Sequence, residues 1–184
     1  MPRIVETIVT TSNAAGEVHI APLGLIEDGD HWVIAPFKPS RTLDNLRANP
    51  FFAASHTQDV RVFAGCVTER KSWPTVATTK IKGGRLAQCQ SHWELKIEKI
   101  IEDEVRPRFL AKIVHVENHQ AWEGFNRAQA AVLELAVLTT RLNMLPLEKI
   151  DNELKYLDIA ISKTAGPNEL EAWGWLMEKV TKWR

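Results

Sequence analysis

The sequence predicts an α+β fold that is mainly β: a small antiparallel barrel over residues 1–119, followed by three helices over residues 120–184. Two observations carry this prediction. Before residue 120, apolar and polar side chains largely alternate, as in strands with one wet face. After residue 120, apolar side chains recur at helical spacing. We therefore expect six or so strands first and the helices last.

The first three strands are predicted from β-branched side chains and a hairpin signal. Residues 3–11 are rich in β-branched residues, and residues 17–26 and 31–37 flank an Asp-Gly-Asp turn. Each strand of this hairpin contains an Ala-Pro pair. Because proline has no N–H for a ladder, we expect Pro22 and Pro36 at strand ends, edges or bulges, where a ligand can meet the backbone.

Two short helices and a strand are expected next. Residues 40–48 are predicted to be a helix with Ser40 as its N-cap. Residues 51–57 are predicted to be a strand. Residues 59–66 are predicted to be a second helix, with Asp59 at the end that the helix dipole makes positive.

A loop and a long antiparallel pair complete the predicted barrel. We expect residues 68–82 to be a loop and residues 84–101 and 105–117 to be two long strands. In the first of these strands, alternation predicts an apolar face and a wet face, formed respectively by Trp93, Leu95 and Ile97 and by Glu94, Lys96 and Glu98.

The last part of the chain predicts three helices. They are expected within residues 120–142, 147–164 and 169–183, with Asn168 and Glu171 spaced as in a capping box. Their apolar positions at helical spacing are Phe125, Ala128, Val132, Leu135, Leu138 and Leu142, then Leu147, Ile150, Leu154, Leu157 and Ile161. Trp173 and Trp175 point apart, so we expect Trp173 in the core and the other at a further element or subunit.

The composition is that of a globular protein, and it argues against nucleic-acid and membrane partners. The chain has 184 residues, with 23 Lys and Arg, 23 Asp and Glu and a net charge of +0, so we expect no nucleic-acid partner. No apolar run reaches the roughly 18 residues of a membrane span, and the N-terminus has no signal-peptide pattern. We therefore expect a cytoplasmic protein with no membrane partner. The lone cysteines Cys66 and Cys89 argue against a disulfide framework or a cysteine zinc site.

The segment 36–47, PFKPSRTLDNLR, is the strongest candidate for a binding site. It follows a predicted strand and opens a predicted helix, whose free N–H groups and positive dipole end favour an anion. An ammonium, two hydroxyls and a guanidinium gather there, which suits a phosphate monoester; these groups are on Lys38, Ser40, Thr42 and Arg41. The alternative is that Ser40 only caps the helix and the cations are solvated.

Two neighbouring segments add to this candidate site. Residues 19–24, HIAPLG, place small residues and proline on the preceding hairpin, where a planar ring can approach the backbone closely. Residues 56–59, HTQD, end the strand after the helix and offer polar groups. Hairpin, helix start and strand end would then surround one pocket.

At this point the sequence resembles the DUF447 family of flavin-reductase-like split barrels. The resemblance rests on GEVHIAPLG, APFKPSRTLDNL, NPFF and HTQDV, and on FNRAQAAVLELAVLTTRL and KTAGPNELEAW near the C-terminus. It covers nearly the whole chain. It implies an FMN-binding split barrel that works as a homodimer, with the flavin near the subunit interface.

The resemblance also implies residue roles. The FMN phosphate would lie at Ser40, Arg41 and Thr42, with Lys38 nearby and Asn45 one helical turn after Arg41. The ring edge would meet Ala21, Pro22, Leu23 and Gly24, while Thr57 and Asp59 would approach the ribityl chain or ring. Gln58 stands at a commonly acidic position of the family, which leaves Thr57 and Asp59 as the better candidates. Arg127 would reach the flavin or substrate across the dimer, unless it is simply solvated.

The activity implied is that of a flavin-dependent oxidoreductase of the flavin-reductase type, with unknown substrate and electron donor. Since a flavin itself supplies the redox step, no catalytic acid or base need be visible, and catalytic residues remain unassigned. Two alternatives stay open: a non-enzymatic FMN-binding or flavin-sensing protein, and a split barrel that binds another phosphorylated or tetrapyrrole ligand. Each alternative predicts a different absorption spectrum or response to reductant.

Other chemistries find little support in the sequence. His115 and His119 have the spacing of metal ligands on a helix, but their segment is a predicted strand, along which four residues span about 13 Å. We therefore expect no metal site. The sequence contains neither the GxSxG elbow of serine hydrolases nor the GxGxxG turn of Rossmann domains.

Overall fold

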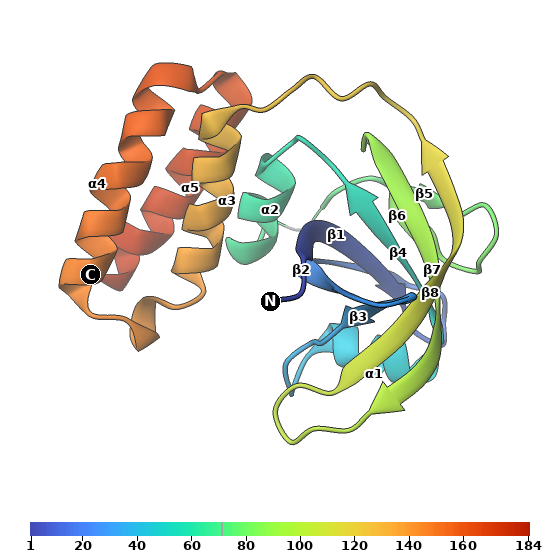
Figure 1. The fold of residues 1–184 in the computed structure, drawn as a ribbon. Coiled ribbons are helices and arrows are strands. Elements are labelled where there is room, and N and C mark those ends of the chain that lie inside the picture. The colour runs from blue at the N-terminus through green and yellow to red at the C-terminus, as the bar shows by residue number, and fades with distance from the viewer. Residues whose placement is uncertain (71) are drawn as a thin grey trace. The chain divides into compact units, whose positions relative to one another are not determined.

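The computed structural model describes residues 1–70 and 72–184 and divides the chain into two compact units. The first unit contains residues 1–57 and 73–121, and the second contains residues 58–72 and 122–184. Figure 1 shows the strands and the short helix α1, Arg41–Ala48, in the first unit and the remaining helices in the second.

Six antiparallel strands of the first unit close into a barrel in the order β1-β2-β3-β8-β7-β4. Their bounds are β1 Ile4–Ser12, β2 Val18–Asp28, β3 His31–Ile34, β4 Phe51–His56, β7 Ser91–Ile101 and β8 Arg108–Asn118. The expected hairpin is confirmed, since Ile26, Glu27 and Asp28 of β2 pair with β3. The predicted fold class, a mainly β barrel of the flavin-reductase-like type with C-terminal helices, is also confirmed.

Proline 22 lies where the sequence analysis expects it. It pairs with Ile8 of β1, and β2 pairs with β3 only from Ile26 onward. The earlier part of β2 therefore has a ladder partner on one side, and a proline can be accommodated there without loss of a hydrogen bond. Pro36 follows the end of β3.

The barrel core is filled by large apolar side chains from strands that lie far apart in sequence. Phe52, Leu95 and Phe109, on β4, β7 and β8, are almost fully buried. Leu43 and Leu46 of helix α1, Arg41–Ala48, join the same cluster. The apolar face of α1 is thus fixed against the barrel, and this fixes the position of its N-terminus.

The segment between the barrel strands differs in part from the expectation. The predicted loop 68–82 contains a short strand, β5 Thr75–Ala77, which pairs with β6 Gly84–Leu86 in a separate sheet of two strands. The predicted strand 84–101 is therefore two strands, β6 and β7. Lys71, in the same predicted loop, lies outside the described residues.

The predicted wet face of β7 is wrong at one residue. Lys96 and Glu98 are exposed, but Glu94 is completely buried. Its carboxylate accepts hydrogen bonds from the backbone N–H groups of Thr79, Lys80 and Ile81 at 2.5, 2.7 and 2.8 Å. Burial alone would raise the pKa of Glu94, but these N–H groups and His92 outweigh it and lower that pKa. Alternation could not show that a distant loop covers this position.

The second unit is a bundle of four α-helices among the described residues. These are α2 Arg61–Val67, α3 Arg127–Thr139, α4 Leu147–Thr164 and α5 Pro167–Trp183, with a short 3-10 turn at Leu142–Met144. Val60 and Ala64 of the α2 segment are buried in the same cluster as Leu135, Ile150 and Leu176. The predicted boundary at residue 119 placed the α2 segment with the barrel, whereas its apolar side chains pack against α3 and α5.

Three details of the predicted helices change. Phe125 precedes α3 and is fully exposed, at 100%, instead of facing a core. Leu147 is at the start of α4 and 52% exposed. Helix α5 begins at Pro167, and Glu169 accepts a hydrogen bond from the Gly166 N–H at 2.9 Å. The cap is therefore this single bond to Gly166 and not the predicted pair Asn168–Glu171.

No helix in the described part of the chain is both long enough and apolar enough to cross a membrane.

Candidate functional site

The candidate anion site is the N-terminus of α1. Ser40 is its N-cap, and its Oγ accepts a hydrogen bond from the Leu43 N–H at 3.3 Å. The amides of Arg41 and Thr42 precede the first intrahelical bonds, so the helix itself gives them no acceptor. These two N–H groups and the positive end of the helix dipole can therefore serve an anion.

Arg41 is the cation best placed to complete this site. Its guanidinium is 55% exposed, and its ion pair with Glu17 is long, at 3.7 Å, with the carboxylate 68% exposed. Exposed pairs of this kind contribute about 0–1 kcal/mol. Arg41 can therefore exchange this partner for a phosphate at little cost.

The buried side chains of α1 position the site. Asn45 is 4% exposed, and its Nδ2 donates to Thr11 Oγ1 on β1 at 3.0 Å. Asn45 thus fastens the helix to the barrel instead of facing a ligand. Thr42 is 3% exposed and lies on the buried face of the same helix. Thr11 is not among the residues predicted for the site, because nothing in a linear pattern connects β1 with α1.

The Lys38 ammonium is bound to the loop between β7 and β8, whereas the phosphate hypothesis expects it at the start of α1. Its Nζ donates to the carbonyl of Asp103 at 2.7 Å, and its backbone N–H donates to the carbonyl of Val105 at 2.9 Å. Both acceptors belong to the loop between β7 and β8. Lys38 therefore stabilises this loop, and the cationic donor at the helix start is Arg41.

The segment Ala21–Gly24 lies in β2, and α1 contacts both β1 and β2. All four residues are half-buried, and Leu23 packs on the barrel core. A Cβ at Gly24 would lie 2.7 Å from Ile4 Cγ2 and 3.3 Å from Glu6 Oε1. A larger residue at position 24 would have to displace the exposed side chain of Ile4 on β1, whereas glycine fits there without any rearrangement.

Thr57 and Asp59 do not share one environment. Thr57 is half-buried directly after β4 in the first unit. Asp59 belongs to the second unit and makes a double contact with Arg61, at 2.8 Å to both Nε and Nη2. This hydrogen bonding raises the pKa of Arg61 above its usual range. Asp59 Oδ1 also accepts from the backbone N–H of Arg61 at 3.1 Å, so Asp59 orders Arg61 at the start of α2.

Gln58 and Arg127 also belong to the second unit. Gln58 is buried; its Nε2 donates to the carbonyl of Gly124 at 3.0 Å, and its Oε1 accepts from the Glu123 N–H at 3.1 Å. An amide has the donor and the acceptor that this contact needs, which a carboxylate lacks. Arg127 is exposed at the first residue of α3.

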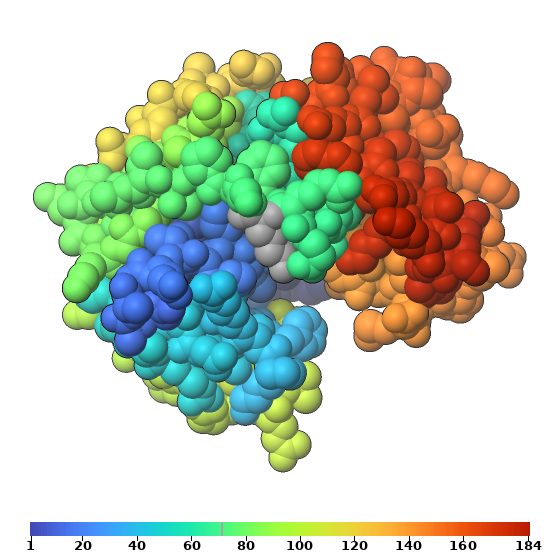
Figure 2. Space-filling model, turned by 180° about the vertical axis from the view of Figure 1, so that it is seen from behind, coloured from blue at the N-terminus to red at the C-terminus, as the bar shows by residue number. Residues whose placement is uncertain are grey.

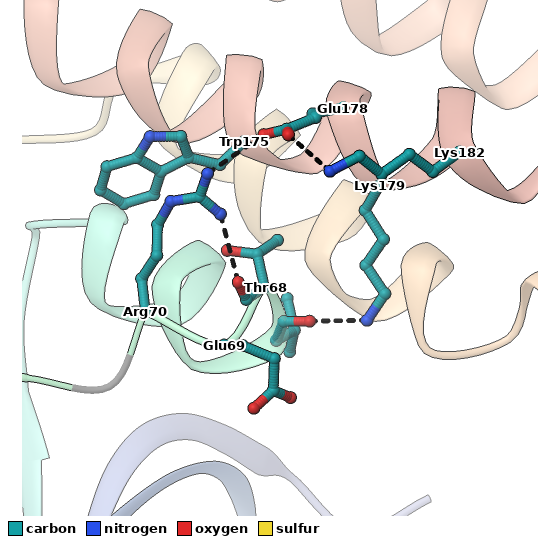
Figure 3. Close-up of a pocket in the computed structure, with 8 residues that line it drawn as sticks. Thr68, Glu69, Arg70, Trp175, Glu178, Lys179 and Lys182 are labelled. Atoms are coloured by element: carbon teal, nitrogen blue, oxygen red, sulfur yellow. Dashed lines mark hydrogen bonds and ion pairs between the residues drawn. The ribbon is translucent and has the colours of Figure 1, made fainter.

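Two of the hollows in the described surface are not lined by Ser40, Arg41 or Thr42. One, of about 480 Å³, is lined by the β1–β2 turn and the end of α1, which lie side by side in dark and lighter blue in Figure 2. The other, of about 260 Å³, lies in the second unit, where Arg70 packs on Trp175 at 5.0 Å and pairs with Glu178 at 3.1 Å (Figure 3). Lys179 donates to the Val67 carbonyl and Lys182 pairs with Glu178. The cations that line this hollow therefore already have partners within the protein.

Trp173 and Trp175 both pack against the helical core as partly buried side chains. The expectation for Trp173 is confirmed. Trp175 contacts Arg70 after α2, which is a further element of the same unit.

Two family models match this chain. The model for the N-terminal domain of a protein of unknown function, DUF447, matches residues 5–120. A second model, also described as a protein of unknown function (DUF447), matches residues 126–178. The chain belongs to the DUF447 family. This confirms the resemblance found in the sequence, and no curated protein matches the chain.

Several solved structures have a fold similar to that of this chain. The FMN-bound DUF447 protein MM1853 from Methanosarcina mazei is 19% identical, with a TM-score of 0.82 over 97% of this chain and 96% of its own. The 2-nitrobenzoate 2-nitroreductase NbaA from Pseudomonas fluorescens is 22% identical, with a TM-score of 0.54 over 65% and 66%. An FMN-binding protein from Thermus thermophilus is 15% identical, with a TM-score of 0.52 over 62% and 71%. The similarity to MM1853 thus includes barrel and helices, and the other two cover about two thirds of this chain.

Proposed function

We propose that this DUF447 protein binds FMN without a covalent link and is a flavoprotein. The observation that carries the proposal is the likeness to an FMN-bound protein of the same family over 97% of the chain. The helix start at Ser40 and Arg41 supports it independently, because its donors suit a phosphate monoester.

The residues present fit the phosphate of FMN. Ser40, the amides of Arg41 and Thr42, and the guanidinium of Arg41 would hold it. Arg41 can bind two phosphate oxygens at once through its planar fork. Asn45 would act indirectly, since its bond to Thr11 fixes the helix on the barrel. Lys38 would act only through the loop that it stabilises.

The ring would meet the Ala21–Gly24 segment of β2. Proline and glycine at positions 22 and 24 leave little side chain on the strand, so a planar ring can approach the backbone. Thr57 remains the candidate for the ribityl chain. We assign no flavin contact to Asp59, because its carboxylate already binds Arg61 through two short bonds.

The finer proposal is an oxidoreductase of the flavin-reductase type, with substrate and electron donor unidentified. Bound FMN would supply the redox chemistry, while the chain would bind and orient it and limit access of water. A flavin-sensing protein would bind FMN equally well. The two functions are separated by adding NADH or NADPH and monitoring the visible absorbance of the bound flavin. An oxidoreductase should lose this absorbance rapidly as its flavin is reduced, and a sensor should not.

We further propose a homodimer. Trp122 and Phe125 support it: they are 58% and 100% exposed and contact each other edge-on, with ring centroids 5.7 Å apart. Exposed aromatic pairs are enriched where proteins bind one another. Light scattering of the purified protein tests the dimer, and a Trp122→Ala/Phe125→Ala double variant should shift it toward the monomer.

The absorption spectrum of the freshly purified protein tests the cofactor assignment. We expect flavin bands and the release of FMN on denaturation. A tetrapyrrole spectrum would support the alternative ligand instead, and a colourless protein that takes up no added FMN would contradict the proposal.

A further inference from the structure

A cluster of histidine and carboxylate side chains lies where β7 begins and β8 ends. His92 of β7 pairs with Glu117 of β8 across the ladder. His119 follows β8 directly, and its backbone N–H donates to the carbonyl of Gln90 at 2.8 Å. The pairing of the two strands thus brings His92 close to Glu117 and His119, which lie 25 and 27 residues later in the sequence.

The buried Glu94 fixes the orientation of His92. Both side chains are completely buried, and His92 Nε2 lies 3.1 Å from Glu94 Oε1. Since a carboxylate accepts, Nε2 carries the proton and Nδ1 keeps its lone pair. Metal-bound histidines commonly have this arrangement, in which the second ring nitrogen donates to a carboxylate.

The free lone pair of His92 faces two further ligand atoms. Its Nδ1 lies 2.9 Å from His119 Nε2. One ring nitrogen of His92, one of His119 and a carboxylate oxygen of Glu117 all lie within 4.8 Å of one another. Zinc bonds of about 2.0–2.2 Å place tetrahedral ligand atoms about 3.3 Å apart. The Glu117 side chain is 42% exposed, and the three ligand atoms lie within 4.8 Å of one another, so binding an ion would require them to move closer together.

The neighbours of the cluster leave it open on one side. The Thr79 hydroxyl donates to Glu117 Oε2 at 3.0 Å and orders this carboxylate. His115 Nε2 lies 3.4 Å from the same oxygen, at the margin of the cluster. The guanidinium of Arg85 bonds the carbonyls of Leu86 and Ala87. The exposure of Glu117 leaves room for water as a further ligand.

We propose that His92, His119 and Glu117 form a binding site for one divalent transition-metal ion such as Zn²⁺, with Glu94 as the carboxylate that positions His92. Two imidazoles and a carboxylate suit zinc and its first-row neighbours better than calcium or magnesium. The ion would join β7 to the chain after β8. The site does not depend on the flavin.

The alternative is a hydrogen bond between the two imidazoles with no metal role. His119 would then donate to His92 Nδ1, and the cluster would only stabilise the barrel. The two readings predict different results for the same titration, because a hydrogen-bonded pair has no affinity for zinc beyond that of any surface histidine.

The test is a titration of the full-length protein, stripped with a chelator, with Zn²⁺ against a chromophoric competitor. We expect one ion per chain, a dissociation constant in the micromolar range or tighter and a higher melting temperature with zinc. Co²⁺ should give visible d–d bands. His119→Ala should weaken zinc binding at least tenfold, and Glu117→Gln should weaken it in the same direction.

His31→Ala is the matched control, because His31 also pairs with a glutamate at 3.1 Å but lies outside the cluster. It should bind zinc as the unchanged protein does. The proposal is overturned if the unchanged protein binds less than half an ion per chain at 100 µM zinc. It is also overturned if His119→Ala keeps full zinc affinity. If the unchanged protein has no zinc affinity and His119→Ala only lowers the melting temperature, the two histidines form a structural hydrogen bond and the proposal is likewise overturned.

Discussion

Arg41 is the residue on which the phosphate assignment depends most. Its guanidinium stands at the start of α1 with only a long, exposed pair to Glu17. Asn45 is engaged with Thr11 and shapes the site from behind, whereas the Ser40 Oγ accepts from the Leu43 N–H and keeps its own O–H to donate to a phosphate. A ligand phosphate would therefore draw its charge-assisted bonds from Arg41 and its backbone donors from the helix start.

We predict that Arg41→Ala weakens FMN binding by about 1.5–3 kcal/mol, the range of a hydrogen bond to a charged group. Arg41→Lys should restore only part of the loss, because an ammonium cannot bind two oxygens in a fork. Titration of flavin fluorescence measures both. Arg47→Ala is the control: it removes an arginine from the same helix, one that pairs with Glu102 at 2.8 Å in the last turn. If Arg41→Ala binds FMN as tightly as Arg47→Ala does, the phosphate lies elsewhere.

At the scale of elements, periodicity predicts most strands and helices but not what covers them. β-branched runs and helical spacing locate β1, β4, α1 and α4 to within about two residues. Glu94 fits a wet face by alternation, yet the 79–81 loop folds over it. The cap of α5 also differs, because Glu169 accepts from the backbone N–H of Gly166, and a bond to a backbone N–H leaves no signature in the identity of residue 166.

Glu94 should be the most costly carboxylate to neutralise in β7. Glu94→Gln leaves backbone donors without a charged acceptor, and we expect a loss of about 2–3 kcal/mol in the free energy of unfolding. Glu98→Gln is the same substitution on the same strand at an exposed position paired with His31 and Lys112. It should change stability by less than about 0.5 kcal/mol. Urea denaturation compares the two, and equal losses would show that the loop bonds contribute little.

At the scale of the whole molecule, the sequence indicates the two parts but misplaces one segment. Apolar spacing changes near residue 120, and this change predicts the boundary there. The α2 segment lies earlier in the chain, but Val60 and Ala64 are buried among the C-terminal helices. A single sequence contains no sign of this exchange, because short apolar helices look alike whichever core they join.

We predict that a fragment ending at residue 119 is poorly soluble. Val60 and Ala64 would lose the side chains that cover them, and an exposed apolar helix face promotes aggregation. Expression followed by light scattering measures this. A soluble, monomeric 1–119 fragment with full FMN affinity would instead show that the barrel is sufficient for binding and that the tail is an addition.

The homodimer proposal makes a separate prediction about size. An obligate interface should bury at least about 2,000 Å² in total. We therefore expect a dimer in light scattering at micromolar concentration, with or without FMN. A monomer that still binds FMN at full affinity would refute a site shared between subunits.

The most direct test of the central claim compares FMN with riboflavin on the same purified protein. The two ligands share the ring and the ribityl chain and differ in the phosphate alone. Our account predicts a micromolar or tighter dissociation constant for FMN and one at least about tenfold higher for riboflavin, since a charge-assisted phosphate contact contributes 1.4 kcal/mol or more. Equal affinity for the two, or no affinity for either, would contradict a phosphate site at the start of α1.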